Sequence, residues 1–153
     1  MISRPTTAQL LEDAARELRD KVLPAVPDPG VQVAVQMLEQ LVRSCAVRAA
    51  NEIAWMRTEE EAMVAYAGEV VAVTRDRSTT DALDEYWLSR RGTLMLDDVC
   101  ADYSLAGAAM SAALTAAMAG GEQVLSARAQ ELMTDRMERE TIIRGEFSLP
   151  GRG

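Results

Sequence analysis

The chain has 153 residues, of which 48% are hydrophobic and 26% charged, and that length favours one domain with a substantial core. Histidine is absent, which removes the usual general base, the commonest metal ligand and the partner of Ser-His or Cys-His nucleophiles. The net charge of −8 argues against nucleic-acid binding and against docking on anionic membranes.

The first predicted helix runs from Thr7 to Leu23. Thr6 and Gln9 have the spacing of a capping box, in which each side chain bonds the other's backbone N–H. The apolar stripe of this first helix consists of Leu11, Ala14, Leu18 and Val22. The sequence PAVPDPG, residues 24–30, is typical of a rigid turn that ends the helix.

The second predicted helix begins near Val31 and has two apolar stripes. The first alternates at spacings of four and three and consists of Val31, Val35, Leu38, Val42, Cys45 and Ala49. The second consists of Ala34, Met37 and Leu41. Two stripes predict a helix buried on a wide face, and therefore central. Thr58 and Glu61 again have capping-box spacing, which indicates either a third helix to about Thr74 or a bend in a continuous helix.

The C-terminal half reads as further helices with short connections. A polar connection over residues 74–81 precedes a helix over 81–91, with Gly92 at the position after its end. Helices are then expected over 94–119 and 122–144, before an irregular tail over 145–153. The inward face of the last helix is expected to comprise Val124, Leu125, Ala129, Leu132, Met133 and Met137. The fold prediction is all-α: a single-domain up-and-down helical bundle of five or six helices spanning residues 1–153.

The segment CAVRAANEIAWM, residues 45–56, interrupts this apolar pattern. Arg48, Asn51 and Glu52 stand where apolar residues are expected, and Trp55 follows. One interpretation is an intrahelical Arg48–Glu52 ion pair with a packing tryptophan. The other is a polar network or protein interface, since Trp and Arg are favoured in binding hot spots.

The segment DEYWLSRRG, residues 84–92, combines Tyr86 and Trp87 with Arg90 and Arg91. Aromatic and arginine side chains suit a protein interface or a phosphate-bearing ligand. The alternative is a short helix that packs its aromatic rings inward and leaves a solvated basic end.

Three further features have a functional and a purely structural interpretation. Asp97, Asp98 and Asp102 could bind Mg²⁺ or act as acid and base, but a solvated acidic face is favoured. Cys45 and Cys100 could be reactive only beside a cationic neighbour, and they are expected instead to be buried, reduced thiols.

The third feature is a row of small residues, Gly107, Ser111 and Thr115, at successive spacings of four. Such a row allows another backbone to approach closely, as in tight packing within a bundle. It also suits a groove for a partner helix or an acyl chain.

Three segments carry a family resemblance: RPTTAQLLEDAARELRDKVLPAV (4–26), AVRAANEIAWM (46–56) and RMERETIIRGEF (136–147). They resemble a group of small all-helical bacterial proteins, best represented in actinobacteria. Those proteins are related to companions of aminoglycoside-phosphotransferase-like kinases and acyl-CoA dehydrogenases. The resemblance is strongest over residues 4–56 and includes no catalytic signature.

The resemblance implies a non-catalytic accessory or interaction protein that supports a kinase-like or acyl-CoA-metabolising enzyme. The alternative is a small-molecule binding protein or enzyme with an acyl or CoA-like ligand in the bundle core. The expected partner is another protein, with a homo-oligomer also open, and neither nucleic acid nor membrane is expected. No cofactor and no metal are expected. A cytoplasmic location is expected, because the N-terminus has no apolar segment typical of a signal peptide.

Overall fold

The computed structural model describes residues 4–145, so the expected tail over 146–153 lies outside the described residues. Within that range the chain is helical apart from short connections and contains no strand. Five helices have eleven residues or more: α1 (Thr7–Glu17), α3 (Pro29–Thr74), α4 (Arg77–Ser89), α5 (Leu96–Gly120) and α6 (Gln123–Arg144). The all-α prediction is confirmed.

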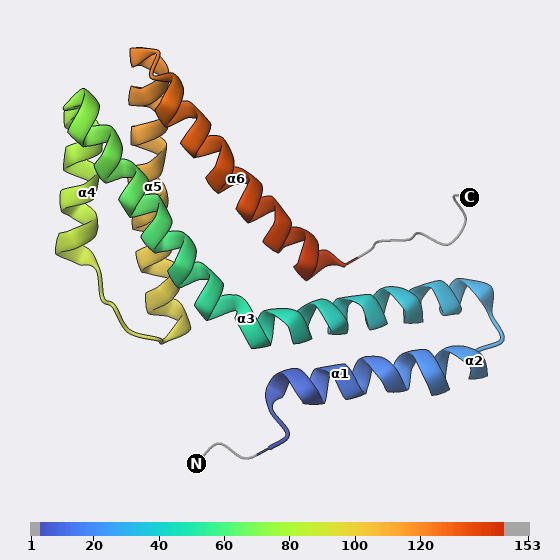
Figure 1. The fold of residues 1–153 in the computed structure, drawn as a ribbon. Coiled ribbons are helices and arrows are strands. Elements are labelled where there is room, and N and C mark those ends of the chain that lie inside the picture. The colour runs from blue at the N-terminus through green and yellow to red at the C-terminus, as the bar shows by residue number, and fades with distance from the viewer. Residues whose placement is uncertain (1–3, 146–153) are drawn as a thin grey trace. The chain divides into compact units, whose positions relative to one another are not determined.

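The helices group into two compact units (Figure 1). Among the described residues, unit 1 comprises 4–52 and 139–145, and unit 2 comprises 53–138. α3 contributes its first part to unit 1 and its second part to unit 2. The prediction of a single domain stays a prediction. No helix among the described residues is both long and apolar enough to cross a membrane.

In unit 1, α1 begins as the capping-box prediction requires. Gln9 N donates to Thr6 Oγ1 at 3.3 Å, and Thr6 N donates to Gln9 Oε1 at 2.9 Å. Helical backbone continues beyond Glu17 through a π-helical turn, Leu18–Val22, and the short α2, Leu23–Ala25. The helical backbone therefore ends two residues after the expected Leu23, within the segment 24–30 that was predicted to end it. Pro24 lies in α2, directly after the π turn, and cannot donate a backbone hydrogen bond.

α3 begins at Pro29, two residues before the predicted start. Asp28 caps it, because its Oδ1 accepts from Gly30 N at 2.7 Å and from Val31 N at 3.1 Å. The helix does not restart at Thr58, whose hydroxyl donates to Ala54 O one turn back, at 3.0 Å. A side chain used in that way cannot cap a new helix, so the continuous alternative is the correct one.

Unit 2 holds the hydrophobic core, built from α3, α4, α5 and α6. Its buried members are Met63, Tyr66, Ala67, Val70, Tyr86, Ala106, Ala109, Met110, Ala113, Ala117, Leu125 and Ala129. Many of these are alanines, which let the helices approach closely. The turn from α5 to α6 passes through Gly121, whose φ of 68° is the left-handed conformation that glycine adopts without strain.

Two boundaries in unit 2 differ from expectation. α4 starts at Arg77 rather than near 81, because Asp76 caps it by accepting from Thr79 N at 2.8 Å. The polar stretch predicted as a connection is therefore largely the first turn of a helix. α4 ends at Ser89, and Gly92 follows in the connection with a φ of 69°.

The predicted inward face of α6 is only partly correct. Leu125 and Ala129 are buried and Leu132 packs against the core, whereas Val124 is 82% exposed. Met133 and Met137 are exposed as well. Each residue turns the helix by about 100°, so the neighbour of a buried leucine points well away from the core.

Candidate functional site

A buried polar network in unit 2 centres on Glu60 of α3. Its side chain has no exposed surface. Tyr86 Oη donates to Glu60 Oε1 at 2.6 Å and Arg90 Nε donates to the same oxygen at 3.0 Å. Arg57, one turn earlier on α3, donates to Glu60 Oε2. We call Arg57, Glu60, Tyr86, Arg90 and Asp102 the polar network.

Asp102 of α5 is the second buried carboxylate of the polar network and is also fully buried. Its Oδ1 accepts from Arg91 N at 2.9 Å, and its Oδ2 accepts from Gly92 N at 2.9 Å and from Arg57 Nη1 at 2.8 Å. Arg57 also donates to the carbonyl of Thr93. Asp102 therefore fixes the connection between α4 and α5. Arg57 bonds the carboxylates of Glu60 and Asp102 and also the carbonyl of Thr93 in that connection.

The charges of the polar network are balanced and its carboxylates are ionised. Burial alone would raise the pKa of Glu60, but the hydrogen bonds from Tyr86, Arg90 and Arg57 outweigh it and lower that pKa. Burial alone would also raise the pKa of Asp102. The hydrogen bonds from two backbone N–H groups and from Arg57 outweigh this effect, so the pKa of Asp102 is lowered as well. Burial and the carboxylate of Glu60 raise the pKa of Tyr86.

This arrangement is suited to holding helices together. A general acid or base works best with a pKa near the working pH, and both carboxylates are shifted away from neutrality. Each carboxylate oxygen of Glu60 and Asp102 already accepts at least one hydrogen bond. Within residues 4–145, no group of three or more His, Cys, Asp or Glu side chains could hold a metal ion.

The segment 84–92 contributes to the polar network and to its edge. Tyr86 is buried. Arg90, which bonds Glu60, also places its Cζ 5.9 Å from the centre of the Tyr86 ring. Arg91 pairs with Asp98 at 2.6 Å, at the exposed edge. Trp87 is 61% exposed and meets Tyr86 edge-on, with 4.8 Å between ring centres.

The residues of the 45–56 segment are placed separately in the two units. In unit 1, Arg48 Nε donates to Glu52 Oε1 at 2.8 Å, and Asn51 Nδ2 donates to Val47 O at 2.9 Å. Both bonds lie within α3. In unit 2, Trp55 is half-buried.

Sequence reasoning missed Arg57 and Glu60 and misjudged Asp102. Asp102 was expected on a solvated face but is fully buried. A signal for Glu60 exists in the sequence, because Glu60, Met63, Ala67 and Val70 follow each other at spacings of three, four and three. An acid within such an apolar seam needs a buried partner.

The two cysteines are also placed differently from expectation. Cys45 and Cys100 are both exposed free thiols, not buried ones. Both sit on helix faces that the described helices of their own unit leave uncovered.

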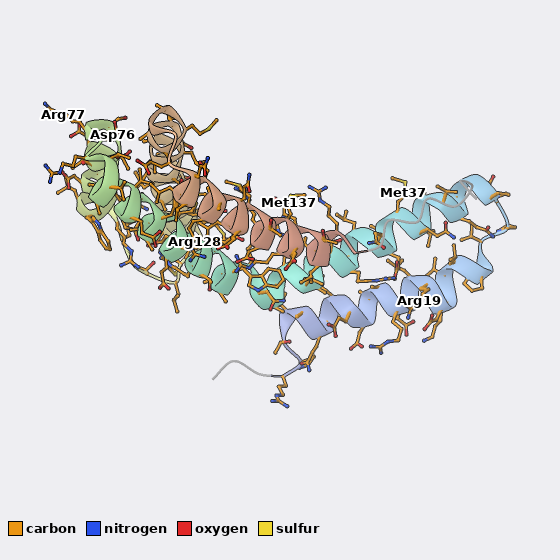
Figure 2. All side chains as sticks on the ribbon, turned by 45° about the horizontal axis from the view of Figure 1, so that its top comes forward. Arg19, Met37, Asp76, Arg77, Arg128 and Met137 are labelled. Atoms are coloured by element: carbon orange, nitrogen blue, oxygen red, sulfur yellow. The ribbon has the colours of Figure 1, made fainter. Side chains whose placement is uncertain are left out.

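An exposed apolar stripe runs along the unit 1 part of α3. It contains Val31, Ala34, Leu38, Leu41 and Cys45, at spacings of three, four, three and four, and we call it the α3 stripe. Leu41 is 60% exposed, and Met37 beside the stripe is exposed as well, pointing away from α1 (Figure 2). Charged side chains are absent from the stripe.

The α3 stripe corrects the prediction that this part of α3 is central. α1 lies alongside α3 (Figure 1), but the buried α3 residues here are Glu39 and Ala46. Glu39 is held by Arg43 and lies 3.9 Å from Arg19. α1 therefore covers a different face of α3 from the one with the apolar stripe.

A pocket of about 610 Å³ lies within unit 2, between α3, α5 and α6. It is lined by Tyr66, Leu114, Ala117, Met118, Ser126, Ala129, Gln130, Met133, Thr134 and Met137. The expected groove residues do not line it: Ser111 and Thr115 are exposed, and a Cβ on Gly107 would meet nothing within 4 Å. Thr115 Oγ1 donates back to Ser111 O at 3.0 Å.

In comparisons with known proteins, no family model, no curated protein and no solved structure matches the chain.

Proposed function

We propose that this chain is a non-catalytic interaction protein that binds a partner protein through the α3 stripe. The observation that carries the proposal is the exposure of five residues at coiled-coil spacing on one face of α3. Soluble monomers rarely expose a continuous apolar surface of this kind unless it binds something. A helix with apolar residues at three- and four-residue spacing suits an apolar groove or another helix.

The partner we propose is a kinase-like or acyl-CoA-metabolising enzyme. The resemblance of residues 4–26 and 46–56 to companions of such enzymes supports this choice. The polar network is consistent with it, because its side chains bond one another across α3, α4 and α5. Chemistry on a substrate would then belong to the partner.

The test is capture of partners by the tagged full-length chain from the cells that produce it, followed by titration calorimetry with the purified partner. We expect a kinase-like or acyl-CoA enzyme in stoichiometric amount. Leu41→Lys should weaken that binding at least tenfold, because a lysine would have to be desolvated at the centre of the interface.

Leu88→Lys is the matched control. Leu88 lies on α4 in unit 2 and is 84% exposed, so the same substitution there should leave both binding and stability unchanged. Equal loss of binding in both variants, or no loss at Leu41, would contradict the proposal. A stable homodimer by light scattering, dissociated by Leu41→Lys, would instead assign the α3 stripe to a second copy of the chain.

A further inference from the structure

The pocket in unit 2 has the size and lining of a small-molecule site. Its volume of about 610 Å³ falls within the range typical of ligand pockets. Three of its ten lining residues are methionines, Met118, Met133 and Met137. Methionine side chains are flexible and polarisable, so they adapt well to apolar ligands.

Tyr66, a residue of the pocket wall, carries an unused hydrogen-bond donor. It lines the pocket from α3 and is 1% exposed, and its hydroxyl has no hydrogen-bond partner among the described residues. Buried hydroxyl groups nearly always have a partner, because leaving one unpaired is costly. Burial, with a contribution from Glu69, raises the pKa of Tyr66, so the hydroxyl keeps its proton and can donate it.

The lining also restricts the charge of a ligand. None of the ten residues that line the pocket is charged; the polar ones are Tyr66, Ser126, Gln130 and Thr134. A carboxylate or phosphate bound there would lose part of its hydration without gaining a cation from the lining, which is unfavourable. A neutral acceptor, such as a carbonyl oxygen, meets the donor of Tyr66 without that penalty.

We infer that the pocket binds a neutral, mainly apolar molecule with one carbonyl group, of the ester, thioester or amide class. Tyr66 Oη donates to the carbonyl oxygen, and the alkyl part lies against the three methionines. This site lies in unit 2 and does not depend on the α3 stripe or its partner. It places an acyl group at Tyr66 and α6, away from Gly107, Ser111 and Thr115.

The experiment uses the full chain and three probes of similar length: methyl octanoate, octanoate and nonane. Binding is followed by nuclear magnetic resonance of ¹³C-labelled methionine methyl groups, with affinities from the titration. Methyl octanoate should shift the signals of Met118, Met133 and Met137 and should bind at least tenfold more tightly than either other probe. Octanoate lacks a counter-ion in the pocket, and nonane lacks an acceptor.

Two tyrosine variants separate the hydroxyl from the rest of the ring. Tyr66→Phe should weaken methyl octanoate binding by about tenfold, the usual contribution of one hydrogen bond, and leave nonane unaffected. Tyr103→Phe is the matched control, because Tyr103 Oη already donates to Glu59 at 2.6 Å and does not line the pocket. Tyr103→Phe should change the affinity for neither methyl octanoate nor nonane.

A third variant tests the position of the site without changing Tyr66. Thr134→Trp places a large ring at an exposed part of the pocket wall and should abolish binding of all probes. Octanoate binding as tightly as the ester, an unchanged ester affinity in Tyr66→Phe, or no ester binding would each overturn the inference. In the last case the hydroxyl of Tyr66 bonds a buried water only.

Discussion

Asp102 is a fully buried carboxylate whose partners come from α3 and from the connection between α4 and α5. Asp102→Asn removes the charge that balances Arg57, and we expect it to lower the free energy of unfolding by about 3 kcal/mol at pH 7, as for other broken buried pairs. Urea denaturation followed by circular dichroism measures this. Asp81→Asn is the control, because Asp81 is exposed and its only described pair, with Arg77 at 3.8 Å, is on the surface.

The pH dependence of the same residue has a definite sign. The pKa of Asp102 is lowered in the folded protein, so its stabilising effect is complete above the ordinary pKa of about 4 and is lost as the pH falls through the folded value. The stability difference between the wild type and Asp102→Asn should therefore be constant from pH 7 to pH 5 and shrink towards pH 3. A difference of the same size at pH 3 would show that packing, not charge, explains the effect.

Residue patterns predicted local contacts well and distant ones poorly. The capping box at Thr6 and the Arg48–Glu52 pair are both found, because each joins residues three or four positions apart. Asp102 was misjudged because its partner Arg57 lies 45 positions away, and nothing in the spacing of either residue reveals the other. The polar network is therefore a product of tertiary packing.

At the scale of single helices, one glycine within α5 and another just after its end should respond oppositely to the same substitution. A Cβ at Gly107 would meet nothing within 4 Å, so Gly107→Ala should stabilise the protein by about 0.5–1 kcal/mol through helix propensity. Gly121, just after α5, has a φ of 68°, so Gly121→Ala should destabilise by about 1 kcal/mol or more. Thermal unfolding of both variants measures this, and stabilisation by both would contradict the left-handed turn at Gly121.

Helix existence was predictable from the sequence, whereas helix ends and exposed faces were not. α5 and α6 agree with expectation to within two residues at each end. The start of α4 was missed because its capping residue, Asp76, lay in a polar stretch that resembles a connection. The α3 stripe was read as buried because periodicity reports that a face is apolar but not whether a neighbouring helix covers it.

At the scale of the whole molecule, the two units differ greatly in how much apolar surface they bury. The hydrophobic core cluster and the polar network both lie within residues 53–138, whereas the buried side chains of residues 4–52 are Ala15, Glu39 and Ala46. Folding requires enough apolar burial to offset the loss of chain entropy. Residues 53–138 meet this requirement far better than residues 4–52.

Separate fragments make that difference measurable. A fragment of residues 53–138 should be helical and should unfold cooperatively on heating, while a fragment of residues 4–52 should be largely unfolded, since so short a chain with so few buried residues is marginal. Circular dichroism during thermal unfolding checks both. Asp102→Asn in the longer fragment should reproduce the destabilisation seen in the full chain, because every described hydrogen-bond partner of Asp102 lies within residues 53–138. Loss of cooperative unfolding in the fragment without the substitution would mean that the core of unit 2 depends on unit 1.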